Sequence, residues 1–154
     1  MERFSKNSRV IKATSEQLYN AFTDKKDLEF WFAPNKMTGK IHNFSLKVGS
    51  GYEMSLFYNN RKIEGKTADN EDRFSVTFIE LEPYSKIIQQ IKFQSDKDEF
   101  AEEMIMEIFL EEVENNSTKI TITFTNIPIG VNPQDNEAGT EQSLKKLAKY
   151  LEKH

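Results

Sequence analysis

Residues 103–125 read EMIMEIFLEEVENNSTKITITFT, and this stretch decides the fold class. The side chains alternate in both halves, and a period of two places successive side chains on opposite faces of a β-sheet. In the second half threonine recurs at every other position, which indicates that one face of the sheet meets water. The ENNST segment between the halves is typical of a hairpin turn. The stretch therefore predicts two neighbouring antiparallel strands.

The acidic residue at position 107 indicates which face of the first strand is buried. An unpaired carboxylate in the interior would cost several kcal/mol, so Glu107 is expected to point outward. Toward the last helix we expect Met104, Met106 and Ile108, and outward we expect Ile105, Glu107 and Phe109. Ile105 and Phe109 would then form a small exposed apolar patch.

Weaker forms of the same pattern predict more strands along the chain. Further strands are expected at residues 8–13, 39–46, 52–56, 73–81 and 86–93. Residues 59–72, NNRKIEGKTADNED, alternate weakly and are rich in glycine, asparagine and aspartate. An irregular strand or a loop is expected there.

Two short helices are predicted between the first strand and the long series of strands. Thr14 and Ser15 followed by Glu16 and Gln17 form an N-cap signal. Leu18, Ala21 and Phe22 then provide one apolar stripe. The second helix, within residues 24–32, is expected to end before Pro34, because proline disfavours a helical conformation in the residue that precedes it.

A long helix is predicted at the end of the chain. Asn132 is a suitable N-cap, and Pro133 suits the first helical position. The apolar face of the C-terminal half consists of Leu144, Leu147, Ala148 and Leu151, whereas its continuation toward the N-terminus reads Glu137, Thr140 and Glu141. The N-terminal half either covers something hollow or wet, or projects past the sheet into solvent.

Three consecutive aromatic residues, Phe30, Trp31 and Phe32, precede Ala33 and Pro34. They cannot all face one core. These rings either close the core or wall a pocket. We expect Phe30 and Phe32 to close the core, and of the two readings for Trp31, the single tryptophan, we expect the pocket wall.

Composition excludes several classes of function. The chain has 154 residues, a formal net charge of -4 and no cysteine, so disulfides and thiolate metal sites are excluded. Its cations are dispersed, which argues against nucleic acid as a partner. It contains neither an apolar run long enough to insert into a membrane nor an apolar leader at its start, so a cytoplasmic location is expected. We expect residues 1–154 to form one domain and the protein to be a monomer.

The sequence offers few candidate catalytic residues. The histidines are His42 and His154, which are too few for a zinc set or a Ser-His-acid triad, and His42 is expected on a strand surface. No catalytic residue, metal site or cofactor is predicted. Four methionines could give a pocket an adaptable lining or could simply fill the core: Met37, Met54, Met104 and Met106.

The order of these segments resembles the helix-grip fold of the START-like, birch-pollen-allergen-like superfamily. Within it, the chain is similar to the activator of Hsp90 ATPase homologue family. The resemblance is carried by Arg9 to Ala13 with LYNAFTDKKDLEFWFAP, by LKVGSGYEM, FIELEPYSKI and STKITITFTNIP, and by NEAGTEQSLKKLAKYLE. It implies an α+β domain in which a curved antiparallel sheet, in the order β-α-α-β-meander-α, grips the C-terminal helix around a cavity. Thr140 stands where many members have tryptophan, which removes a bulky plug from the cavity.

This resemblance leads us to expect a protein that binds a hydrophobic small molecule in a cavity of roughly 300 to 1,000 Å³. The residues expected to line the cavity are Trp31, Tyr52, Met54, Phe78, Met106, Ile122 and Leu144. Two alternatives stay open. The family resemblance also implies regulation of an Hsp90-type chaperone ATPase, and some members of the superfamily are cyclase-like or hydrolase-like enzymes.

Overall fold

The structure is a computed structural model that describes residues 3–60, 62–67 and 70–152. His154 lies outside the described residues. The strands are β1 (Ser5–Ile11), β2 (Met37–Phe44), β3 (Gly51–Tyr58), β4 (Glu71–Glu82), β5 (Lys86–Phe93), β6 (Met104–Glu114) and β7 (Ser117–Thr125). The helices are α1 (Ser15–Thr23), α2 (Lys25–Trp31) and α3 (Pro133–Glu152), with a short 3-10 helix at Asp98–Phe100.

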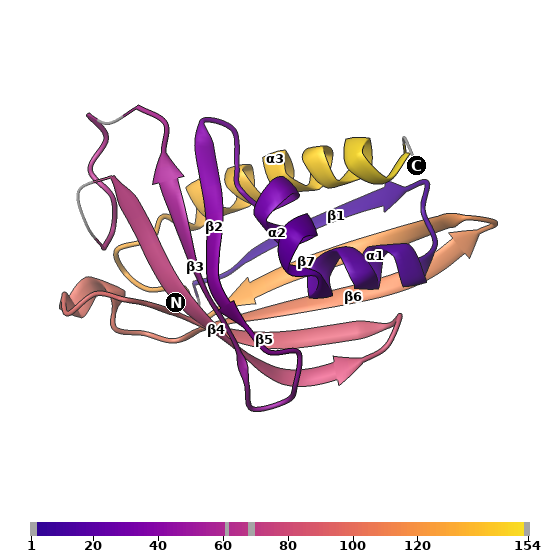
Figure 1. Cartoon of the computed structure of the whole chain (residues 1–154), viewed down its shortest axis with the longest axis horizontal. Helices are drawn as coiled ribbons and strands as arrows, with labels where there is room; N and C mark the ends of the chain where they lie inside the picture. Colours follow the sequence, from indigo (N-terminus) through magenta and orange to yellow (C-terminus); the bar gives the residue numbers. More distant parts are fainter. Residues whose placement is uncertain (1–2, 61, 68–69, 153–154) are drawn as a thin grey trace.

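The seven strands form one antiparallel sheet in the order β1-β7-β6-β5-β4-β3-β2. The sheet is strongly curled, and α3 lies along its concave side, close to β1 (Figure 1). Helices α1 and α2 follow β1 and precede β2 in the sequence, and they pack on each other. This architecture confirms the predicted helix-grip fold.

Residues 103–125 form the hairpin that their alternation predicts. Strand β6 pairs with β7 from Ile105 with Thr125 to Glu114 with Ser117. Asn116 occupies the turn with a φ of 59°, a left-handed conformation that asparagine tolerates better than most residues.

The predicted direction of the β6 side chains is confirmed. Met104, Met106 and Ile108 are buried, whereas Glu107 is half-buried on the outer face. Phe109 is 40% exposed and Ile105 is half-buried. The exposed apolar patch therefore exists, with Phe109 contributing more to it than Ile105.

The predicted starts of α1 and α3 are confirmed by the hydrogen bonds of their N-caps. At α1 the Thr14 hydroxyl accepts a hydrogen bond from the Gln17 backbone N–H at 3.1 Å, and the Gln17 side chain accepts one from the Thr14 N–H. At α3 the Asn132 Oδ1 accepts hydrogen bonds from the N–H groups of Gln134 and Asp135.

Several segments differ from their predicted boundaries. Strand β1 begins at Ser5 rather than residue 8, and β2 covers 37–44 rather than 39–46. Within the uncertain segment 59–72, β4 already begins at Glu71, and the described residues before it form bends and turns.

The expectation that Phe30 closes the core is wrong. Phe30 is 60% exposed and lies against the Tyr150 ring of α3, with 5.1 Å between ring centroids. The short helix α2 buries Leu28 and Trp31 instead, which are three residues apart and share one face of the helix. Phe32, just past the end of α2, packs against the core.

Trp31 is fully buried between two aromatic rings. Its ring centroid lies 4.7 Å from that of Phe22 and 5.5 Å from that of Phe32, both in edge-to-face arrangements. Its indole N–H donates a hydrogen bond to the Ala21 carbonyl at 3.0 Å. Trp31 therefore fixes α2 to α1.

Substitutions at Trp31 separate the contribution of its hydrogen bond from that of its ring packing. We expect Trp31→Phe to lower the free energy of unfolding by about 1 to 2 kcal/mol, since the Ala21 carbonyl loses its donor. Trp31→Ala should cost about 3 to 5 kcal/mol, because it also empties the space between α1 and α2. Urea denaturation followed by circular dichroism measures both, and equal losses would show that the ring itself contributes little.

Candidate functional site

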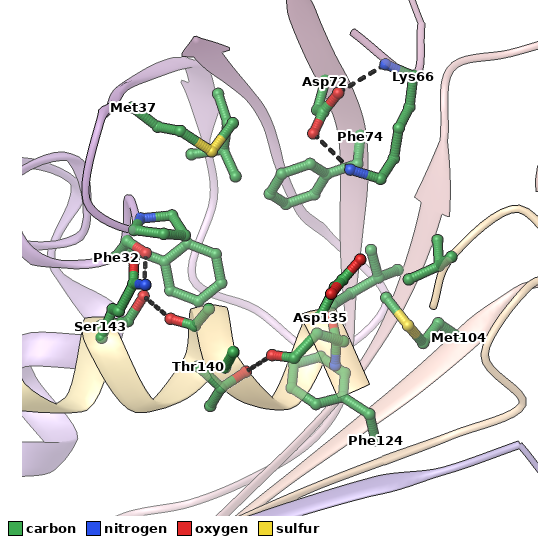
Figure 2. A pocket seen from close by; sticks show the side chains of 18 of the residues that line it. Phe32, Met37, Lys66, Asp72, Phe74, Met104, Phe124, Asp135, Thr140 and Ser143 are labelled. Atoms are coloured by element: carbon green, nitrogen blue, oxygen red, sulfur yellow. Dashed lines mark hydrogen bonds and ion pairs between the residues drawn. The ribbon is translucent and has the colours of Figure 1, made fainter. Parts of the chain in front are cut away.

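A cavity of about 450 Å³ lies between the N-terminal half of α3 and the concave side of the sheet. Strands β3 to β7 provide its floor, and the segment after α2 and the loop before α3 close its sides (Figure 2). The apolar lining consists of Trp31, Phe32, Pro34, Met37, Leu56, Phe74, Ile91, Phe93, Met104, Met106, Ile122, Phe124, Val131 and Ala138. The cavity is thus large enough for a small organic molecule and mostly apolar.

The N-terminal half of α3 forms one wall of this cavity. Asn136, Gly139, Thr140 and Ser143 line it, and their spacing places them on one face of the helix. Of the two alternatives that the sequence left open, the first therefore holds: this half covers a hollow. Of the three residues expected on this face of α3, however, Thr140 lines the cavity and Glu137 and Glu141 do not. Glu137 and Glu141 lie toward β1, where the Glu137 carbonyl accepts from Asn7 and the Glu141 carboxylate lies 3.5 Å from Arg9.

The hydroxyl groups on this wall are hydrogen-bonded to the backbone. Thr140 donates to the Asn136 carbonyl at 2.8 Å, and Ser143 lies 2.6 Å from the Phe32 carbonyl. These bonds satisfy polar groups that would be costly beside an apolar space. Ser143 also ties α3 to the segment that follows α2.

Small residues keep α3 close to that segment without filling the cavity. A Cβ atom added at Gly139 would meet Pro34 at 3.5 Å, which is an ordinary contact distance. Thr140, the next residue, lines the cavity where the family resemblance suggests a tryptophan. The space that a large ring would occupy is therefore open in this chain.

A polar cluster of Tyr58, Lys66 and Asp72 lines the opposite side of the cavity. Asp72 is only 3% exposed, and its Oδ2 accepts from the Lys66 ammonium and from the Tyr58 hydroxyl, both at 2.8 Å. Its Oδ1 accepts from the Lys66 backbone N–H at 2.6 Å. Figure 2 shows Lys66 and Asp72 across the cavity from Asp135 and Thr140 of α3. A buried carboxylate is thus fully paired within the cavity wall.

Lys66 and Tyr58 of this cluster stay protonated over a wide pH range. Burial by itself lowers the pKa of Lys66, but the neighbouring Asp72 carboxylate and the Tyr58 hydroxyl outweigh it, so the pKa lies above its ordinary value. Burial, with a further contribution from Asp72, raises the pKa of Tyr58 despite the opposing charge of Lys66. At neutral pH both groups are therefore protonated, and neither is suited to act as a base or nucleophile.

The structure brings three of the seven expected cavity residues together. Trp31, Met106 and Ile122 line the cavity. The others lie in the closed part of the core: Tyr52, Met54, Phe78 and Leu144 are buried but are not in the lining. The reason is that Phe44, Tyr52 and Phe78 pack their rings together at 5.4 to 6.3 Å and fill that end of the sheet. Whether any of the seven contacts a ligand stays a prediction.

Sequence reasoning missed the polar part of the site. Lys66 and Asp72 fall in the segment 59–72, where no periodicity signals which side chains face inward. Asp135 sits in the first turn of α3, where an acidic residue is ordinary. Met37 and Met104 do line the cavity, as one reading of the methionines allowed.

His42 lies outside the cavity lining. His42 is exposed on β2, as expected, and its Nε2 lies 2.8 Å from the Ser55 hydroxyl, which is buried and bonded to Glu71. Within the described part of the chain no three histidine or acidic side chains converge as metal ligands. No helix there is long and apolar enough to cross a membrane.

The family is established by comparison with known proteins. The family model described as activator of Hsp90 ATPase homolog 1-like protein matches residues 12–152. The chain belongs to this family. A search of curated proteins finds no match.

Solved structures share the same START-like fold. A crystal structure of a Chromobacterium violaceum protein has a TM-score of 0.86 at 26% identity, covering 97% of both chains. A solution structure from Arthrobacter aurescens has a TM-score of 0.80 at 15% identity, covering 99% of this chain and 87% of the other. DynU16, a putative protein of the dynemicin biosynthetic locus, has a TM-score of 0.68 at 16% identity, with 99% of this chain matching 48% of that one.

The Lys66–Asp72 pair allows a direct test of the cavity wall. Asp72→Asn should lower the free energy of unfolding by about 1 to 3 kcal/mol, since it leaves Lys66 without its counter-charge. Lys66→Met with Asp72→Asn should be less destabilising than Asp72→Asn alone, because no unpaired charge remains. Urea denaturation at neutral pH measures both effects.

The same pair predicts a dependence on pH. Because the pKa of Lys66 is raised on folding, its stabilisation is complete below the unfolded value of 10.5 and is lost as pH rises through the higher folded value. The wild type should therefore lose stability above pH 10.5 relative to the double variant. Parallel curves for the two proteins would contradict the pairing.

Proposed function

We propose that this protein binds an apolar small molecule in the cavity between α3 and the concave side of the sheet. The observation that supports this most strongly is the open space beside Thr140 and Gly139, where the fold could have been closed by one large side chain. The apolar lining and the few polar groups at two sides fit a site that buries a hydrophobic body and orients a polar end.

The shape of the lining supports the same proposal. Phe32 and Phe74 pack against each other at the cavity wall with 6.4 Å between ring centroids, and Met37 and Met104 also line the space (Figure 2). Methionine side chains adapt to ligands of different shape at little cost. We therefore expect affinity for flat or flexible apolar compounds rather than for sugars or nucleotides.

A second candidate function is regulation of a chaperone ATPase, which the description of the family favours. It would require a partner surface rather than a cavity. Stimulation of an Hsp90 ATPase by the purified chain, retained when the cavity is blocked, would support this function instead.

Enzymatic activity of the cyclase type finds less support. The polar cluster of Tyr58, Lys66 and Asp72 lines the cavity, and the raised pKa of Lys66 and Tyr58 leaves both protonated. Orientation of a ligand is the role that this cluster suits best.

Thr140→Trp tests the proposed function with the fold intact. We expect the indole to occupy the cavity, so that binding of hydrophobic probes such as flavonoids or alkyl compounds is lost while stability is equal or higher. Glu137→Trp is the matched control, since Glu137 lies on the same helix, is exposed and is outside the lining.

Isothermal titration calorimetry measures binding by the wild type and both variants. The native tryptophan gives a second signal, because Trp31 lines the cavity and its emission should change saturably on occupancy. Equal affinity of the wild type and Thr140→Trp would show that the probe binds elsewhere.

A further inference from the structure

The charged groups around the cavity are unequal in sign. Among the residues that the structure describes, the charged ones in the lining are Lys66, Asp72 and Asp135, one positive and two negative. The Lys66 ammonium is already matched by Asp72 at 2.8 Å. Within the described part of the chain, Asp135 forms no ion pair. An incoming polar group therefore meets one uncompensated negative charge.

Asp135 is well placed to act on a ligand. It is exposed at the mouth of the cavity, on the first turn of α3, and Figure 2 shows it across the space from Phe74 and Lys66. A molecule whose apolar body packs against the Phe32 and Phe74 side of the cavity would present its other end to this mouth. That end would lie near the carboxylate.

The N-terminus of α3, which would ordinarily attract an anion, is closed. Pro133 has no N–H group to offer. The N–H groups of Gln134 and Asp135 donate to the Asn132 side chain at 2.8 and 3.1 Å, and that of Asn136 donates to the Asn132 carbonyl at 3.0 Å. The first turn of the helix is thus already satisfied by its own cap.

The two hydroxyl groups on the α3 wall also favour a cationic group over an anionic one. Thr140 and Ser143 both donate their protons to backbone carbonyls, so toward the cavity they present oxygen lone pairs. A ligand group that carries N–H or O–H protons can bond to them, whereas a carboxylate, which only accepts, cannot.

We propose that the cavity selects its ligand by charge: it prefers an apolar molecule with a cationic end, such as an alkylamine, and discriminates against one that ends in a carboxylate. This inference rests on the proposed function and adds the chemical class of the ligand. Asp135 is the residue that sets the preference, and Lys66 does not reverse it because Asp72 neutralises it.

Three probes of equal chain length test the charge preference: decylamine, decanol and decanoate at neutral pH, where the amine is protonated and the acid ionised. Affinity is measured from Trp31 emission and by calorimetry. Decylamine should bind roughly tenfold more tightly than decanoate, with decanol between them, as expected for a partly exposed charge pair. Added salt should reduce the difference.

A matched pair of variants separates the local charge from the net charge. Asp135→Asn should remove most of the preference for decylamine. Glu137→Gln changes the net charge equally, on an exposed residue of the same helix outside the lining, and should keep the preference. Equal effects of the two variants would contradict a role for Asp135.

The outcomes distinguish this inference from the proposed function. If all three probes bind with equal affinity, or if decanoate binds most tightly, the charge preference is overturned while the binding function stands. If none of the three binds to the wild type, the proposed function fails and the inference fails with it.

Discussion

A single helix must close the concave side of a seven-stranded sheet, and only one half of that helix carries side chains large enough to do so. Leu144 and Leu147 of α3 are fully buried, whereas the preceding turns present Gly139, Thr140 and Ser143 to the cavity. Close packing cannot be completed where the facing residues are small. The cavity of about 450 Å³ follows directly from this difference between the two halves.

The same helix half is held in place by polar contacts instead of core packing. Ser143 bonds to the Phe32 carbonyl, the Asn136 amide donates to the Ser5 hydroxyl at 3.0 Å, and Asn7 of β1 donates to the Glu137 carbonyl at 3.0 Å. Each such bond contributes about 1 kcal/mol, less than a buried leucine would. The protein therefore forgoes some core stability at this place, a cost that a bound apolar molecule would offset.

The fold could be predicted from the sequence because its signals are local and repeated. Alternation in residues 103–125, the Thr14 cap and the Asn132–Pro133 helix start each correspond to an observed element. The site was predicted less well, because alternation separates inward from outward side chains but does not say which inward ones meet an empty space. Met54 and Met106 have the same pattern, yet Met54 packs beside Gly39 in the closed core and Met106 lines the cavity. Lys66 and Asp72 pair with each other in a stretch of sequence that has no periodic signal.

The methionines provide the most direct measurement of the central claim, that the space beneath the N-terminal half of α3 is the binding site. Met37, Met104 and Met106 line the cavity, and Met54 is a buried internal control. In a protein labelled with ¹³C at the methionine methyl groups, titration with an apolar ligand should shift the signals of the three lining residues together and saturably, and leave that of Met54 nearly unchanged. Equal shifts at all four positions, or no shift at the lining three while calorimetry shows binding, would contradict the account.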